Sequence, residues 1–228
     1  MLNICRICFT SPILTRNQLP FCVSCSNELA ELRLYNSNCK LTFVAAPNSE
    51  IQSLWRYRGV IRELILRAKV KRDCAALRHL VSLVESCDEV QSLVNWSDVI
   101  IPAPSSLWGR VHGSLDIASQ VAHQLSKKTG KTISTAPSDL YWRWRKQARR
   151  GRESRVDEDL IEMSILKLRR SFLKWFGSNN GSVPSFPNRV LLIDDVVTSG
   201  ATLSKTARAL KDRGAGVVRC LTIARSYT

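Results

Sequence analysis

One stretch near the C-terminal end limits most strongly what this chain can fold into. Residues 189–203 read Arg-Val-Leu-Leu-Ile-Asp-Asp-Val-Val-Thr-Ser-Gly-Ala-Thr-Leu. The apolar first part predicts a buried strand over 189–193, because a short run without polar residues is typical of strands covered on both faces. Asp194 and Asp195 follow at the carboxyl end of that strand, where open α/β sheets bind their ligands. The stretch therefore predicts a parallel α/β sheet with a binding site at this strand end.

The loop after the two carboxylates has the composition of a phosphate site. Its five residues are Thr198, Ser199, Gly200, Ala201 and Thr202. A helix is expected from about Leu203 to Arg213, ended by Gly214, so the loop places backbone N–H groups and hydroxyls at a helix N-terminus. Gly200 lets the backbone approach a ligand closely, and the upstream carboxylates can accept hydrogen bonds from ribose hydroxyls. We therefore expect a sugar phosphate as the ligand.

Two further apolar runs predict strands of the same sheet, over 98–101 and 216–223. The first leads into the rigid loop Pro102-Ala103-Pro104, and a helix closed by Gly130 follows. Strand, loop and helix form one βα unit. Together with the C-terminal unit, they predict a parallel sheet with helices on both faces.

The segment before the first βα unit has helical periodicity. Apolar residues recur at helical spacing from Leu54 to Ala68 and again from Leu77 to Val84, with basic residues between them. The pattern predicts two amphipathic helices with solvated basic faces. Lys69 and Lys71, between the two helices, are candidate anion contacts.

Four cysteines near the N-terminus form two C-x-x-C pairs, Cys5 with Cys8 and Cys22 with Cys25. Each pair presents two thiolates to one cation, and four thiolates without an open position are typical of a structural zinc site. The segment between the pairs is too small to fold on a core of its own, so metal binding would supply its folding energy. Cys39 is an alternative ligand, and a redox dithiol is the alternative chemistry.

The other cysteines and the apolar runs indicate the compartment. Cys74, Cys87 and Cys220 stand among apolar residues and are expected to be buried, unreactive thiols. Cysteines paired for metal binding suit a reducing cytosol. The N-terminus lacks the order of a secretory signal, and the longest apolar runs are far shorter than the roughly 20 residues of a membrane span. We expect a soluble cytoplasmic protein without membrane insertion.

The charge of the chain indicates a polyanionic partner. It carries 34 Lys and Arg against 19 Asp and Glu, a net charge of +15. Much of this excess lies in residues 141–155, where aromatic and basic side chains alternate. The candidate nucleic-acid contacts are Trp142, Arg143, Trp144, Arg145, Lys146, Arg149 and Arg150. Rings that stack on unpaired bases beside cations that follow the backbone favour single-stranded nucleic acid, and a solvated helix face with inward-packed tryptophans is the alternative.

The stretch 189–203 resembles the phosphoribosyl-pyrophosphate (PRPP) signature of type I phosphoribosyltransferases. Together with the cysteine pairs, the segment Tyr57-Arg58-Gly59 and the loop Ile101-Pro102-Ala103-Pro104, it resembles the ComF family. In that family a small zinc head is joined to a phosphoribosyltransferase domain. The resemblance implies a zinc-binding head over 1–45 and a phosphoribosyltransferase-like parallel sheet flanked by helices over 46–228.

The resemblance also assigns roles to residues. It implies that Asp194 and Asp195 are the catalytic carboxylates that hold the ribose hydroxyls. The loop 198–202 would hold the 5′-phosphate, and Mg²⁺ would bridge pyrophosphate and ribose oxygens. The family's Arg-x-Arg-Gly stretch is matched by Arg110-Val111-His112-Gly113, so Arg110 would face the pyrophosphate while His112 replaces the second arginine.

Two functions follow from the resemblance. ComF proteins are associated with natural competence, which implies a cytoplasmic factor of DNA uptake in natural transformation. Such a factor would bind a PRPP-type sugar phosphate and single-stranded DNA, with a DNA-uptake helicase as partner. The alternative is a metabolic phosphoribosyltransferase that transfers phosphoribose from PRPP to a small base or amine and releases pyrophosphate. Turnover is left open in the first case. No residue stands out as a dedicated nucleophile or base.

Overall fold

The computed structural model describes residues 4–5, 7–8, 21–35, 50–104, 115–134 and 187–227. Within these ranges it holds a five-stranded sheet in the order β1-β5-β4-β2-β3, and every neighbouring pair is parallel. The strands are β1 (Glu50–Arg56), β2 (Val99–Pro102), β3 (Thr132–Ile133), β4 (Arg189–Val197) and β5 (Val217–Arg225). The predicted parallel sheet is therefore confirmed.

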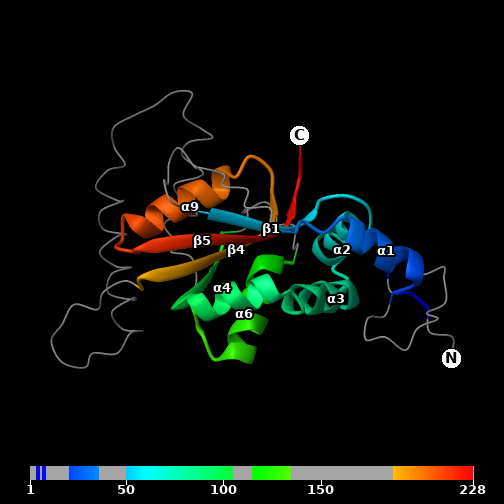
Figure 1. The fold of residues 1–228 in the computed structure, drawn as a ribbon, viewed down its shortest axis with the longest axis horizontal. Helices are drawn as coiled ribbons and strands as arrows, with labels where there is room; N and C mark the ends of the chain where they lie inside the picture. Colours follow the sequence, from blue (N-terminus) through cyan, green and yellow to red (C-terminus); the bar gives the residue numbers. More distant parts are fainter. Residues whose placement is uncertain are drawn as a thin grey trace.

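Helices cover both faces of this sheet (Figure 1). They are α1 (Val23–Glu31), α2 (Gly59–Lys69), α3 (Cys74–Glu85), α4 (Asp88–Trp96), α6 (Ile117–Thr129) and α9 (Ala201–Lys211). Helix α9 packs on one face, where Leu203 and Leu210 share a core with Leu192. Helices α2, α3, α4 and α6 share a second core on the other face. The predicted arrangement of helices on both faces is thus also confirmed.

The centre of β4 is fully buried because the strand lies in the middle of the sheet. Val190, Leu191, Leu192 and Ile193 have no exposed surface, which explains the continuous apolar run. The strand continues to Val197, beyond its expected end, because the backbone goes on pairing with β5 whatever the side chains are. The two aspartates therefore lie within the last residues of the strand and not after it.

The predicted helix from Leu54 is wrong at its start. Residues 50–56 form β1, and the helix begins only at Gly59. Ile51 and Leu54 stand three residues apart, and this spacing fits a helix as well as a short strand. Only the pairing with β5 shows that the segment is a strand. Gly59 has a φ of +45°, and a Cβ there would lie 1.7 Å from Oε1 of Glu28. The turn from strand to helix therefore favours glycine.

Most predicted helix ends agree with the structure. Helix α6 ends at Gly130, whose φ is +70°. Helix α9 begins two residues earlier than expected. After its last turn Gly214 adopts a φ of +100°, and the N–H of Ala215 donates to the carbonyl of Leu210 at 3.1 Å. Helix α4 was not predicted, because its apolar residues are few and the helix is short.

The described N-terminal residues pack on the core of helices α2 and α3. Cys5, Phe21 and Leu29 are buried and belong to the same apolar cluster as Leu64 and Leu80. This part of the chain therefore shares its apolar interior with the sheet domain, and the division into 1–45 and 46–228 stays a prediction. None of the helices in the described ranges has the length and apolar character that crossing a membrane requires.

Candidate functional site

The two predicted carboxylates lie at the carboxyl end of the central strand. Asp195 is 9% exposed, and Asp194 is partly buried. Oδ1 of Asp194 accepts the backbone N–H of Asp195 at 2.8 Å, and Oδ1 of Asp195 accepts the N–H of Val196 at 2.8 Å. These local bonds fix both carboxylates at the sheet edge, where parallel sheets bind ligands.

The carboxylates differ in their neighbours, because successive side chains of a strand point to opposite faces. Asp195 forms an ion pair with the ammonium of Lys69, the last residue of α2. Burial raises the pKa of Cys220, in the core under α9, and the nearby charge of Asp194 raises it further. The pair therefore faces both layers of helices.

Burial and charge set the protonation of this cluster. Burial raises the pKa of Asp194 to about 7, and the neighbouring charge of Asp195 acts in the same direction. Burial alone would lower the pKa of Lys69, but the charge of Asp195 outweighs it, and the pKa of the ammonium is raised. Asp195 is the ion-pair partner of Lys69, and Asp194 is the carboxyl whose pKa lies near neutral pH.

The predicted phosphate loop directly follows β4. Thr198 and Ser199 are exposed, and Gly200 adopts a φ of +71° as the residue before α9. The N-cap residue Gly200 has no side chain that could cap the helix, and the nearest such contact in the described residues is long: Ser199 Oγ accepts the N–H of Ala201 at 3.4 Å. An uncapped helix N-terminus turns backbone N–H groups outward, which suits a phosphate dianion.

Two more elements reach the same edge. The N–H of Ala103, just after β2, donates to the carbonyl of Ile193 at 2.7 Å, so the proline loop begins beside the end of β4. The N–H of Leu115, just before α6, donates to the carbonyl of Lys69 at 3.3 Å. The ends of β2, β4 and α2 and the start of α9 therefore surround one site.

Of the two lysines named as anion contacts, only Lys69 reaches the site. Lys71 is 69% exposed in its side chain and lies 3.7 Å from Glu63 of α2. The sequence showed both as basic residues after a helix. Their separation depends on where α2 ends, which local periodicity defines only to within a few residues.

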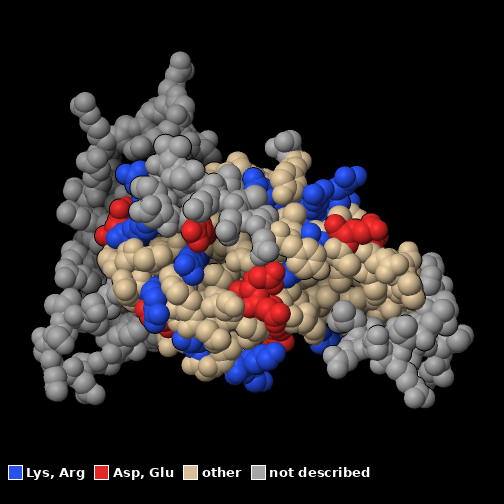
Figure 2. Space-filling model, in the orientation of Figure 1, with Lys and Arg blue, Asp and Glu red and all other residues tan. Residues whose placement is uncertain are grey.

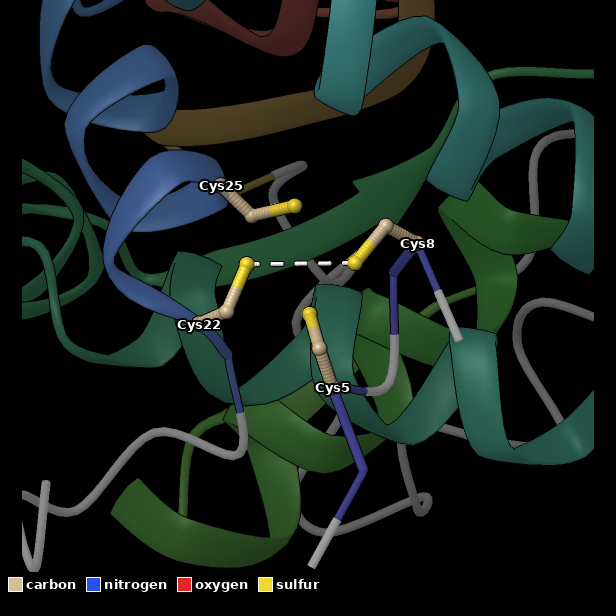
Figure 3. Close-up of side chains that lie close together, drawn as sticks. All are labelled: Cys5, Cys8, Cys22 and Cys25. Atoms are coloured by element: carbon tan, nitrogen blue, oxygen red, sulfur yellow. Dashed lines mark hydrogen bonds between the residues drawn. The ribbon is translucent and has the colours of Figure 1, made fainter. Parts of the chain in front are cut away.

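The four N-terminal cysteines form one cluster, as predicted. Figure 3 shows their sulfur atoms pointing toward a common centre, two from the N-terminal segment and two from the start of α1. All four Sγ atoms lie within 4.8 Å of one another, and Sγ of Cys8 lies 3.8 Å from Sγ of Cys22. A Zn–S bond of about 2.3 Å gives a tetrahedron with edges of about 3.8 Å, so the cluster fits a four-thiolate metal site.

The electrostatics of the cluster favour a cation at its centre. Burial raises the pKa of Cys25, and the neighbouring thiols Cys22, Cys5 and Cys8 raise it further. Four sulfurs so close together, three of them on buried cysteines, cannot all ionise without a positive charge between them. The described cysteines could therefore bind a metal ion, and zinc is the ion whose usual geometry they match.

The three other cysteines among the described residues do not all behave as predicted. Cys87 and Cys220 are buried, and burial raises the pKa of Cys87 to about 11. The prediction for Cys74 is wrong, because this residue is exposed at the start of α3. Its place at the outer end of an amphipathic helix leaves it on the solvent side, where no core residue covers it.

Basic residues also surround the end of the last strand. The guanidinium of Arg225 lies 5.0 Å from the ring centroid of Tyr227, and that of Arg56 lies 5.9 Å from it. Tyr227 is 58% exposed. On the face drawn in Figure 2, Lys and Arg are interspersed with Asp and Glu and do not form one large basic field.

Several predicted contacts lie outside the described residues. They are Cys39, Arg110 and the basic aromatic residues Trp142, Arg143, Trp144, Arg145, Lys146, Arg149 and Arg150. Their roles stay predictions.

A family model described as phosphoribosyl transferase domain matches residues 112–226. Among solved structures, the crystal structure of orotate phosphoribosyltransferase from Aeropyrum pernix is similar, at 16% identity and a TM-score of 0.37. The match covers 68% of this chain and 63% of that one, so this chain spans less than two thirds of it. No curated protein matches the sequence.

The family match includes the site described above. Residues 112–226 make up half of the 228-residue chain and contain β4, the predicted phosphate loop, α9 and β5. The chain therefore belongs to the phosphoribosyl transferase domain family.

Proposed function

We propose that this protein binds PRPP at the carboxyl end of β4. The observation that carries the proposal is the order of groups along the chain: two adjacent carboxylates, then a hydroxyl-rich loop that opens into an uncapped helix. Asp194 and Asp195 would accept hydrogen bonds from the ribose hydroxyls. The loop 198–202 would bind the 5′-phosphate. The family match supports this assignment, because it covers all of these residues.

The chemistry open to such a site is departure of pyrophosphate from the ribose. The described residues offer no dedicated nucleophile, so the protein would act by positioning the ligand and by stabilising charge. The hard carboxylate oxygens of Asp194 and Asp195 suit Mg²⁺, which, when bound with PRPP, neutralises charge on the pyrophosphate. Arg110, from the loop after β2, would face the same group.

We infer further that the protein acts as a ComF-like cytoplasmic factor of natural transformation. Support comes from the order of parts: a cysteine cluster that fits a metal, then the sheet domain with its PRPP-type motif. In this proposal the head over 1–45 is stabilised by zinc. A helicase of DNA uptake would be its partner.

Single-stranded DNA is the polyanion that we propose for this role. The surface formed by Arg56, Arg225 and Tyr227, here called the strand-end surface, lies close to the site, since Arg225 pairs with Val197 just before the phosphate loop. Within the described residues neither arginine forms an ion pair. An exposed ring with two guanidiniums 5.9 and 5.0 Å from its centroid suits an unpaired base and its phosphates. The basic aromatic residues 142–150 are further DNA contacts that we propose from the sequence.

A metabolic phosphoribosyltransferase is the second candidate. The same carboxylates and loop support it equally, since they concern PRPP and not the acceptor. This second candidate differs in two expectations. A small base or amine would accept the phosphoribose, and the protein would not bind DNA.

Two measurements test the proposal. Calorimetric titration with PRPP and Mg²⁺ should show binding, and pyrophosphate release with a panel of bases and amines would favour the metabolic enzyme. Gel retardation with a single-stranded oligonucleotide at about 50 mM salt should show a complex that weakens as salt rises. The double variant Arg56→Gln with Arg225→Gln should weaken the DNA complex. Arg208→Gln, at an exposed position of α9, should weaken it less. Absence of any DNA complex would contradict the transformation role.

A further inference from the structure

The ion pair between Lys69 and Asp195 occupies the place that a ribose would need. One oxygen of Asp195, Oδ1, accepts the backbone N–H of Val196 at 2.8 Å. The other oxygen, Oδ2, binds the ammonium of Lys69. Both oxygens of this carboxylate are thus engaged within the described part of the chain. A ribose hydroxyl that donates to Asp195 would share these oxygens with Lys69 and weaken the ion pair.

The two partners of the ion pair differ in how firmly they are held. The side chain of Asp195 is 12% exposed, whereas that of Lys69 is 42% exposed. The carboxylate belongs to the central strand and is fixed by its own backbone contact. The lysine side chain has a flexible stem and an open side. The ammonium can therefore leave the carboxylate without repacking the core, while Asp195 stays in place.

The position of Lys69 indicates which group of the ligand its ammonium would contact. The phosphate loop leads into α9, on one face of the sheet, whereas Lys69 ends α2 on the other face. Its carbonyl accepts the N–H of Leu115, which follows the loop from β2. In PRPP the 5′-phosphate and the pyrophosphate are attached at opposite ends of the ribose. A ligand with its 5′-phosphate in the loop 198–202 would thus extend its pyrophosphate toward the side of Lys69.

We propose that Lys69 is an exchangeable counter-ion of the sugar-phosphate site. It holds Asp195 in the ligand-free protein, yields the carboxylate to the ribose hydroxyls, and then pairs with the pyrophosphate. The inference rests on the proposed binding of PRPP. The physical reason is that a buried carboxylate without a partner is costly, so the protein keeps a cation there until the ligand replaces it. A lysine suits this exchange, because its compact charge can rotate on a long stem.

The test compares two ligands that differ only in the pyrophosphate. Ribose 5-phosphate has the hydroxyls and the 5′-phosphate, and PRPP has the pyrophosphate in addition. In Lys69→Met, ribose 5-phosphate no longer competes with the ammonium, so its Kd should fall by about threefold or more. PRPP loses its cationic partner, so its Kd should rise by about tenfold or more. Calorimetric titration of both ligands in the same Mg²⁺ buffer measures these changes.

Lys71→Met is the matched control, because it removes the same charge two residues away and should leave both Kd values unchanged. A merely structural Lys69 would weaken both ligands together, and that result would overturn the proposal, as would no change in either. Lys69→Gln is the second variant, because its amide can still donate to Asp195 if methionine unfolds the protein. Because a neutral amide binds Asp195 more weakly than an ammonium does, the Kd for ribose 5-phosphate should still fall, by a smaller factor, and the Kd for PRPP should still rise. If the wild-type protein binds neither ligand, the PRPP function itself fails. If the wild-type protein binds PRPP, but the Lys69 variants do not lower the Kd for ribose 5-phosphate and raise that for PRPP, only the proposed exchange of Lys69 fails.

Discussion

The ammonium of Lys69 lies against the carboxylate of Asp195, although 126 residues separate them in the sequence. Lys69 ends α2, which lies outside the stretch 112–226 that matches the phosphoribosyl transferase domain. Strands β1 and β2 lie outside it as well. The N-terminal half of the chain thus completes both the sheet and the charge balance of the candidate site.

The two aspartates at the end of β4 should each be required for PRPP binding. Asp194→Asn and Asp195→Asn remove the charged acceptors for the ribose hydroxyls, and we expect the Kd for PRPP to rise by about tenfold or more, since hydrogen bonds to charged groups contribute about 1.5–3 kcal/mol. Asp212→Asn, exposed after α9, serves as the control. Titration calorimetry measures the affinities, and unchanged binding in both site variants would place the ligand elsewhere.

The raised pKa of Asp194 predicts the sign of a pH effect on stability. Unfolded, this carboxyl titrates near 3.8, and folded it titrates at about 7. Between these values the folded protein keeps a proton that the unfolded chain has released, so the contribution of Asp194 to the free energy of unfolding falls as pH rises. Above about pH 7 the loss is complete.

Urea denaturation of the wild type and Asp194→Asn should reveal this effect. The amide does not titrate, so the free energy of unfolding of the wild type should drop relative to the variant by more than about 1 kcal/mol between pH 4.5 and 8. Other groups, such as Asp98, whose pKa is lowered by its bond with Arg189, contribute equally to both proteins and cancel. Parallel curves would mean that burial does not perturb Asp194.

The cysteine cluster should carry about one metal ion per chain. Replacing Cys8 and Cys22 by serine removes two of the four ligands, and we expect metal content to fall to near zero with a loss of thermal stability. Cys74→Ser alters an exposed cysteine outside the cluster and should leave both unchanged. Elemental analysis by mass spectrometry identifies the ion. A double variant that keeps its metal would refute the assignment.

Gly59 should tolerate a side chain less well than Gly130. Both have positive φ, +45° and +70°, so replacement by alanine should lower the free energy of unfolding by about 1–2 kcal/mol at each position. A Cβ at Gly130 meets nothing within 4 Å, whereas at Gly59 it displaces the carboxylate of Glu28. That carboxylate accepts the N–H of Val60 at 3.3 Å, so its bond at the start of α2 is lost as well. Chemical denaturation should show Gly59→Ala as less stable by about a further 1 kcal/mol, and equal losses would argue against this contact.

Local patterns were sufficient for the parts that a single segment determines. The apolar runs around Val99 and Val190 indicated the central strands, because strands buried on both faces have no polar residues. Gly130 marked a helix end, because glycine adopts positive φ at low cost. The spacing of two C-x-x-C pairs indicated that four thiols lie in one cluster.

Contacts between distant segments were beyond such patterns. Strand β1 was assigned to a helix, because its few apolar residues fit both periods and only β5 selects the strand. The exposure of Cys74 depends on which side of α3 faces the core. The partner of Asp195 could not be named, because an ion pair needs two side chains to approach within about 4 Å, and a linear sequence contains no such distance.

The sequence by itself determined the parallel sheet, the place of the two carboxylates at a strand end, and the grouping of four cysteines into one cluster. Each of these depends on residue type and spacing within a short segment. Only the tertiary structure decided that Lys69 and not Lys71 meets Asp195, and that burial raises the pKa of Asp194 to about 7. Interactions between charges and the burial of a carboxyl depend on distances in space, and the packing of α2 against the sheet sets these distances.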